Sequence, residues 1–293
     1  MFDRAQIDTL AAILRTGSFD GAASALGLTQ SAVSQRIRAL EEAAGTVLIR
    51  RGPPATATAE GQRLARHAEE LRLIDLDLAR DLGRSPKVGE TAMVRVAVNA
   101  DSLATWVLPA LARVEGVLFD IVVDDESVSA DLLRRGEVSA AVSTPGPAIA
   151  GCESVALGSL PYRATAAPDF ARRWFPDGAT AQALAVAPVL TFSVNDKHQA
   201  NWIAARTGRT LHPPSHYLSS TQGFLKATEL GLGWCLNPAS LCDPLIAAGQ
   251  LVDLDPGRPF LQPLVWQVSR RIKTHLLPLT RAIRSEAARA LIP

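Results

Sequence analysis

The sequence predicts an N-terminal all-α winged helix-turn-helix, a long linker helix and a following two-lobe α/β domain. Three observations predict this fold class. Residues 18–40 have the pattern of two short helices joined by a tight turn, and leucines recur every seven residues from Leu64 to Leu78. After residue 90, short β-branched runs alternate with amphipathic segments. The expected divisions are a head at 1–60, a linker helix and hinge at 61–90, and a last domain at 91–293, with lobe I at about 91–160 plus 269–293 and lobe II at about 161–268.

The first motif contains one helix stop and two helix starts. Gly17 suits a helix C-terminus and Ser18 an N-cap, so a helix is expected to begin directly after them. Gly27 permits the left-handed residue that a helix-turn-helix turn often uses, and Thr29 caps the second helix. The apolar positions of that helix have helical spacing and predict one buried stripe, made of Val33, Ile37, Leu40 and Ala44.

The opposite face of the second helix is polar. Its side chains can hydrogen-bond base edges and phosphates, and they cluster in the N-terminal half, the part that enters the major groove. The segment 47–54 follows as a hairpin, or wing, with two arginines for the phosphate backbone. A solvated surface is the alternative, but the small-residue helix, the turn glycine and the basic wing together favour binding to double-stranded DNA. The expected DNA contacts are Thr29, Gln30, Ser31, Ser34, Gln35, Arg38, Arg50 and Arg51.

The segment after the wing predicts a helix that pairs with a copy of itself. Thr58 and Gly61 lead into a run from 62 to 82 whose apolar residues have heptad spacing and charged neighbours. A helix packed on its own domain is the alternative, but no other core is apparent in this segment. We therefore expect a homodimer through Leu64, Leu71, Ile74, Leu78 and Leu82.

Composition limits the possible functions. A chain that is 47% hydrophobic and 20% charged can form more than one core. Its net charge of +1 argues against non-specific coating of nucleic acid; the arginines at 36, 38, 50 and 51 concentrate positive charge on the reading helix and wing instead. The sequence shows neither a run of about 18 apolar residues nor a leader, so we expect a cytoplasmic protein without membrane contact. Buried reduced thiols are expected at Cys152, Cys235 and Cys242, with a redox pair of the last two as a weaker alternative.

Beyond residue 90 the order of elements predicts an open parallel sheet that binds ligands at the carboxyl ends of its strands. Strands are expected at 93–98, 118–123 and 138–143, with helices at 102–114 and 129–135. Two lobes joined by crossing segments would form a hinged cleft. The second lobe and the return to the first are expected from apolar runs at 186–192, 233–237 and 264–268 and from a final helix at 275–291.

Polar residues follow the first two of these strands, at the edge where the cleft is expected. The segment 99–106 opens a helix whose free N–H groups suit an anion, assisted by the hydroxyls of Ser102 and Thr105. Plain N-capping by Ser102 or Asp101 is an equal alternative. The acidic triplet at 124–126 suits a cationic group, with a solvated turn as its alternative. The expected ligand contacts are Asn99, Asp101, Ser102, Thr105, Trp106, Asp124, Asp125 and Glu126.

The N-terminal segment resembles the LysR-type transcriptional regulators. The resemblance lies in Ser31-Ala-Val-Ser-Gln-Arg-Ile-Arg-Ala-Leu-Glu41, the wing and the Thr-x-x-Gly step at 58–61. The segment 99–106, the acidic triplet and Leu132-Leu-Arg-Arg-Gly136-Glu-Val are similar to the ArgP/LysG branch, which responds to lysine and arginine. Asp124 departs from the glutamate usual there, and the resemblance spans nearly the full chain.

The resemblance implies a periplasmic-binding-protein-like effector domain and an activator of genes for export or biosynthesis of basic amino acids. L-lysine or L-arginine would be the effector, with no cofactor, and RNA polymerase a partner. It further implies tetramers built from dimers. The opposing wall of the cleft would include Asp196, His198, Thr221 and Gln222.

Other functions are less favoured by the sequence. A LysR-type regulator of another small-metabolite pathway is the nearest alternative. No HExxH, GxSxG or Walker motif indicates an enzyme or metal site, and prolines separate His212 from His216. A solute-binding transport component would not need the DNA-binding head.

Overall fold

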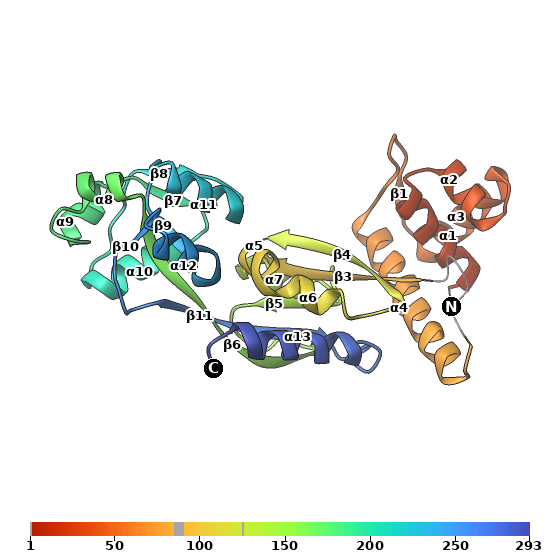
Figure 1. The fold of residues 1–293 in the computed structure, drawn as a ribbon. Helices are drawn as coiled ribbons and strands as arrows, with labels where there is room; N and C mark the ends of the chain where they lie inside the picture. The colour runs from red at the N-terminus through yellow and green to blue at the C-terminus, as the bar shows by residue number, and fades with distance from the viewer. Residues whose placement is uncertain (1, 85–90, 125) are drawn as a thin grey trace.

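The structure, a computed structural model, describes the backbone of residues 2–84, 91–124 and 126–293. Figure 1 shows three parts: a helical head at the N-terminal end, the linker helix α4 (Ala59–Asp81) beside it, and an elongated α/β region with two lobes. This order of elements is the predicted one. The boundaries proposed from the sequence for the head, linker and lobes stay predictions.

The three helices of the head begin and end at the predicted signals. α1 (Arg4–Thr16) ends at Gly17, whose φ is 75°, and the Ser18 side chain caps α2 (Phe19–Leu26). Gly27 has a φ of 64°, and the Thr29 hydroxyl accepts a hydrogen bond from the first turn of α3 (Gln30–Ala44). The predicted stripe of α3 is buried at Val33, Ile37 and Leu40 and half-buried at Ala44. The helix-turn-helix geometry is therefore confirmed.

The predicted wing is a two-stranded hairpin. β1 (Ile49–Arg50) pairs antiparallel with β2 (Thr56–Ala57), and the Thr58 hydroxyl then caps α4. Gly61 lies against the wing, where a Cβ atom would collide with the Leu48 carbonyl. The Thr-x-x-Gly step thus caps the linker helix and lets its first turn approach the wing closely.

The central sheet has the strand order β10-β6-β11-β5-β3-β4, and β9 pairs with β6. The three predicted strands are confirmed and run parallel, as β3 (Ala92–Asn99), β4 (Val117–Asp124) and β5 (Ala140–Ser143). The prediction of a wholly parallel sheet was wrong, because two long antiparallel strands complete it. These are β6 (Cys152–Ala166) and β11 (Phe260–Ser269), to which the short β9 (Cys235–Pro238) and β10 (Val252–Asp253) are added.

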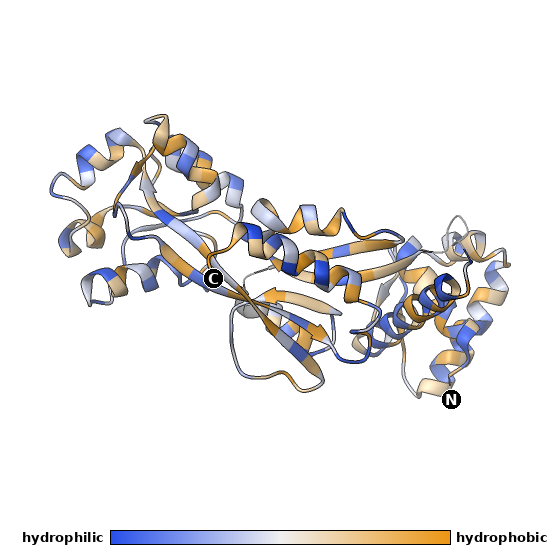
Figure 2. Cartoon of the chain, turned by 60° about the horizontal axis from the view of Figure 1, so that its bottom comes forward, coloured by the Kyte–Doolittle hydropathy of each residue, from blue (hydrophilic) through white to orange (hydrophobic). Residues whose placement is uncertain are grey.

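β6 and β11 run from one lobe to the other, as Figures 1 and 2 show. Their register shifts between Leu264 and Val265, opposite Gly158, whose φ is 115°. A bulge and a glycine in this conformation bend the pair where it leaves the first lobe.

The helices of the first lobe cover both faces of the sheet. α7 (Glu126–Arg134) and α13 (Leu277–Ala290) lie close to their predicted positions. The helix predicted at 102–114 begins earlier and is interrupted. It consists of α5 (Ala100–Ser102), a π-helical turn (Leu103–Val107) and α6 (Leu108–Leu111).

The second lobe surrounds a small parallel pair of strands, β7 (Val189–Thr191) and β8 (Ser215–Tyr217). A helix begins at Thr221, one of the residues expected on the opposing wall of the cleft. The described helices of this lobe are α8 (Pro168–Trp174), α9 (Ala181–Val186), α10 (His198–Thr207), α11 (Thr221–Glu229) and α12 (Ala239–Ala247). Across the described ranges, no helix is both long and apolar enough to span a bilayer.

The linker helix packs on its own chain more than the sequence predicts. Ala65 and Ala68 belong to the core of the head, whereas Leu73 and Leu76 belong to the core beside β3. The expectation that this segment has no core of its own was therefore wrong. Of the predicted dimer stripe, Leu64 packs against the core of the head, Leu71 and Ile74 are half-buried, and Leu78 and Leu82 are 57% and 68% exposed.

We predict that Leu78→Glu converts the expected dimer to a monomer, because it places a charge in the exposed part of the apolar stripe without disturbing the buried face of α4. Sedimentation velocity over a range of protein concentrations measures this change. Leu230→Glu, at a 74% exposed leucine of the second lobe, is the matched control and should leave the dimer unchanged. A Leu78→Glu protein that still sediments as a dimer contradicts the proposed stripe.

Candidate functional site

The residues predicted to contact DNA lie on two neighbouring elements of the head. On the wing, Arg50 and Arg51 are both exposed. The guanidinium carbon of Arg51 lies 5.3 Å from the centre of the Phe19 ring, a cation–π contact that holds this arginine beside the start of α2. At α3 the structure exposes Thr29, Gln30, Ser31, Gln35 and Arg38 and leaves Ser34 half-buried.

Two neighbouring charged residues have structural roles that the sequence did not predict. Glu41 of α3 accepts hydrogen bonds from the backbone N–H groups of Leu48 at 2.8 Å and Ile49 at 3.3 Å, and so ties the wing to the reading helix. Arg36 is one of the arginines that were expected to concentrate positive charge on the reading helix and wing, but its guanidinium donates a hydrogen bond to the Thr9 hydroxyl of α1 at 3.4 Å. Arg36 therefore braces α3 against α1.

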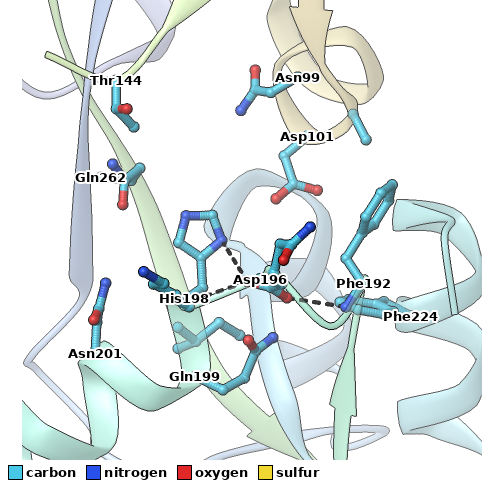
Figure 3. A pocket seen from close by; sticks show the side chains of 14 residues that line it. Asn99, Asp101, Thr144, Phe192, Asp196, His198, Gln199, Asn201, Phe224 and Gln262 are labelled. Carbon is cyan, nitrogen blue, oxygen red and sulfur yellow. Dashed lines mark hydrogen bonds and ion pairs between the residues drawn. The ribbon is translucent and has the colours of Figure 1, made fainter. Parts of the chain in front are cut away.

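A cavity of about 480 Å³ lies between the two lobes. Figure 3 shows Asn99 and Asp101 entering it from the end of β3 and the start of α5, with Asp196, His198 and Phe192 on the opposite side. The other labelled residues of its lining are Thr144, Gln199, Asn201, Phe224 and Gln262. The predicted cleft is therefore present, and the two sequence segments expected to face each other do so.

Asp101 joins the two sides of this cavity. Its carboxylate accepts a hydrogen bond from the Tyr162 hydroxyl of β6 at 2.6 Å and another from the Thr221 hydroxyl at 2.7 Å. Thr221 is the first residue of α11, so the second bond spans from one lobe to the other. Hydrogen bonds to a carboxylate are stronger than those between neutral groups, so the bond between Asp101 and Thr221 stabilises the contact between the lobes.

Three predicted contacts do not line the cavity. Ser102 is fully buried, and among the described residues its hydroxyl has no hydrogen-bond partner. The Thr105 hydroxyl donates to the Asp101 carbonyl at 2.6 Å, and Trp106 belongs to the core. The helical run starts at Ala100 after Asn99, so neither Ser102 nor Asp101 caps it.

The acidic triplet falls at the limit of what the structure describes. Asp125 lies outside the described residues, as do the side chains of Asp124 and Glu126. Their backbone places Asp124 at the end of β4 and Glu126 at the start of α7. Asp124 is the register partner of Asn99, so β4 ends at the same sheet edge as the cavity.

The second wall is built on a loop that Asp196 organises. Its two carboxylate oxygens accept the backbone N–H groups of Phe192 at 3.0 Å and His198 at 2.9 Å. The Nδ1 atom of His198 lies 3.6 Å from the same carboxylate, and its ring lies 5.4 Å from that of Tyr162. Gln222 does not line the cavity, whereas Thr221 reaches it through Asp101.

The sequence did not single out Gln199, which is 4% exposed and lines the cavity. Within the described part of the chain its Oε1 atom has no hydrogen-bond partner. A buried acceptor without a donor is costly, so a ligand that donates a hydrogen bond there would be favoured. The proximity of Gln199 to Asp196 and His198 was its only sequence signal.

The cysteines contribute no reactive group to this site. Cys235 and Cys242 are fully buried and unpaired with each other, and burial raises the pKa of each thiol to about 12. Both thiols are therefore protonated at neutral pH. In the described residues, no cluster of histidine, cysteine and acidic side chains could hold a metal ion.

A winged helix-turn-helix joined through one helix to a two-lobed domain with a polar cleft defines a DNA-binding regulator that responds to a small molecule. Comparisons with known proteins support this class. Residues 5–62 match the family model for the bacterial regulatory helix-turn-helix protein, lysR family, and residues 88–291 match the LysR substrate binding domain.

Similar proteins extend over the whole chain. The HTH-type transcriptional regulator ArgP of Pseudomonas aeruginosa is 38% identical, covering 100% of this chain and 98% of its own. The crystal structure of ArgP from Mycobacterium tuberculosis has a TM-score of 0.82 at 34% identity, covering 100% of this chain and 99% of that one. Full-length LysG from Corynebacterium glutamicum with bound effector Arg has a TM-score of 0.68 at 35% identity, covering 99% and 100%.

The chain belongs to the LysR family of bacterial transcriptional regulators. Its relatives are named as regulators, which confirms the expectation of a DNA-binding regulator rather than an enzyme. The fold class is also confirmed, because the similarity to full-length regulators covers the head, the linker helix and both lobes.

We predict that Gln35→Ala and Arg38→Ala each weaken DNA binding by about tenfold, since a bidentate contact to a base is worth about 1–3 kcal/mol. Fluorescence anisotropy measures this on a duplex that the wild-type protein selects from a random-sequence pool. Arg172→Ala, at an exposed arginine of the second lobe, is the control. Unchanged affinity in both head variants contradicts their assignment to the reading face, provided that thermal melting shows folded proteins.

Proposed function

We propose that this regulator senses a basic amino acid, L-arginine or L-lysine, in the cavity between its lobes and controls genes for export or biosynthesis of that amino acid. The observation that carries the proposal is the set of hydrogen-bond acceptors around the cavity, centred on the Asp101 carboxylate. The relatives named ArgP, and the LysG structure with bound Arg, support the same ligand class.

The size of the cavity fits a small metabolite. A volume of about 480 Å³ lies within the range of about 300–1,000 Å³ typical of small-molecule sites. The lining contains several hydrogen-bond acceptors. Asp101 and Asp196 supply carboxylates, and Gln199 supplies an unpaired amide oxygen. Such a lining suits a ligand rich in N–H donors, as an ammonium or guanidinium group is.

The α-carboxylate of the amino acid needs donors, and two features supply them. The helical run from Ala100 begins at the cavity, and α11 begins at Thr221, which bonds to Asp101 there; we propose that backbone N–H groups at these helix starts bind the carboxylate. Lys197 also lines the cavity and adds a cation. Because β4 ends at the same sheet edge, we propose the acidic triplet at 124–126 as a further partner for the cationic group of the ligand.

A ligand in this position can influence the head through β3. One end of β3 is Asn99 at the cavity, and the backbone N–H of Met93 near the other end donates to Glu69 of the linker helix at 3.1 Å. The second oxygen of Glu69 accepts from Arg15 of the head at 3.3 Å. Glu69 therefore contacts the sensing domain and the head at once, and we propose that closure of the lobes acts on DNA binding through it.

The proposal includes the assembly and partners that the sequence predicts. The stripe on α4 would form the dimer, and contacts between effector domains would form the tetramer. Acting as an activator, the assembly would place two heads on DNA and engage RNA polymerase. The division of the chain into a head, a linker and two lobes belongs to the same proposal.

We predict that the protein binds L-arginine and L-lysine, and binds the uncharged analogues citrulline and norleucine at least tenfold more weakly, because the acceptors favour a cation. Calorimetric titration of metabolite-free protein measures all four ligands. Asp101→Asn should weaken arginine binding at least tenfold, whereas Asp169→Asn, at an exposed aspartate of the second lobe, should not. The proposal fails if neither basic amino acid binds, or if norleucine binds as tightly as lysine.

We further predict that Glu69→Gln uncouples the two functions. The change weakens the ion pair with Arg15, so arginine should bind as in the wild type but shift DNA affinity much less. Anisotropy titrations with and without saturating arginine measure the shift, and Glu60→Gln on the same helix is the control. A full ligand response in Glu69→Gln would show that the signal takes another route.

A further inference from the structure

A second cavity lies between the linker helix and the effector domain, away from the cleft. It has a volume of about 350 Å³ and is lined by the first half of α4, the turn that follows α7 and the segments next to β6 and β11. Its lining is strongly cationic in a chain whose net charge is only +1. The charged residues of the lining are Arg63, Arg66, Arg134, Arg135 and Arg271, with His67 and a single acid, Glu70.

The arginines of this cavity are incompletely neutralised. Arg134 and Arg135 pair with acids of their own segment, Asp131 and Glu137, and Arg271 lies 4.0 Å from Glu70. No ion pair of Arg63 or Arg66 occurs in the described part of the chain. Both of these arginines come from α4, so the linker helix carries the unpaired charge.

Arg66 is the least exposed of these arginines. Its Nη1 atom is buried, and among the residues that the structure describes it has no hydrogen-bond partner. Burial lowers the pKa of its guanidinium, and the nearby cations Arg95 and Arg63 act in the same direction, although Glu137 and Glu70 oppose them. A buried N–H group of a guanidinium that lacks an acceptor is energetically costly, and an anion in the cavity would supply the acceptor.

We propose that this cavity binds a small polyvalent anion, a metabolite with phosphate or several carboxylate groups, held by Arg63 and Arg66 of α4 together with the arginines at the end of α7. The guanidinium fork of arginine matches both groups bidentately. The site uses no residue of the cleft, so it is independent of the basic amino acid proposed above.

The location of the site indicates its effect. An anion bound there contacts the linker helix on one side and the effector domain on the other, and so strengthens their contact. DNA is a less suitable occupant, because four segments of the chain line the cavity and the Nη1 atom of Arg66 is buried within it. A small anion can enter where a duplex backbone cannot.

The test is calorimetric titration of the full-length protein with pyrophosphate and, separately, citrate, at constant ionic strength set by sodium chloride. We expect saturable binding of one anion per chain by at least one probe, and the probe that binds identifies the group recognised. Arg66→Gln and Arg63→Gln should each weaken it about tenfold, while Arg172→Gln should not. Arg63 is exposed, so its variant decides the matter if Arg66→Gln does not fold.

Several results would overturn the site. These are the absence of saturable binding for both probes, or binding that is equally tight in wild-type, Arg63→Gln and Arg66→Gln proteins. Weaker DNA binding by both variants in anion-free buffer, with no change in anion binding, would assign these arginines to DNA instead. An L-arginine titration of the same samples reports on the cleft separately, so a failure there leaves the anion site standing.

Discussion

Both lobes depend on one hydrogen-bonded pair of strands. β6 and β11 remain paired from Cys152 with Ser269 in the first lobe to Tyr162 with Phe260 near the second. Any movement of one lobe relative to the other must therefore bend or twist this pair, and the bulge opposite Gly158 is where it yields most easily. The cavity lies beside this hinge, and the hydrogen bond between Asp101 and Thr221 spans the cavity. A change in the bonding of the Asp101 carboxylate is therefore coupled to bending of the two strands.

The sequence predicted best those features that local signals determine. Thr29, Gly27 and Ser18 act within one turn of backbone, and β3 to β5 are runs whose hydrophobicity is unambiguous. β6 escaped prediction because Gly158 and Pro161 interrupt its alternation and its partner β11 lies about a hundred residues away. Three other residues of the cavity lining escaped prediction for the same reason, because only topology brings Gln262, Asn201 and Thr144 together.

The first wall shows a subtler limit of sequence reasoning. Asn99 and Asp101 line the cavity, but Ser102 and Trp106 face the core, because the helical run starts two residues earlier than expected and contains a π-helical turn. At 3.6 residues per turn, neighbouring residues point about 100° apart, so the side-chain directions of a short segment depend on local winding that composition does not specify. The packing of the linker helix was predicted wrongly for a different reason. Its heptad leucines were apparent in the sequence, whereas the small alanines that pack against the head carry no distinctive sequence signal.

The chain is nearly neutral as a whole, but its acceptors and its cations gather in two different places. Acceptors gather in the cavity between the lobes, and unpaired arginines gather where α4 meets the effector domain. A helix of 23 residues is about 34 Å long, close to one turn of B-DNA. Tilting such a helix by about 10° at its effector end would displace the attached head by about 6 Å, nearly two base-pair steps. A small tilt at the sensing domain thus becomes a displacement that exceeds a base-pair step, the unit in which the spacing of the two DNA half-sites is counted.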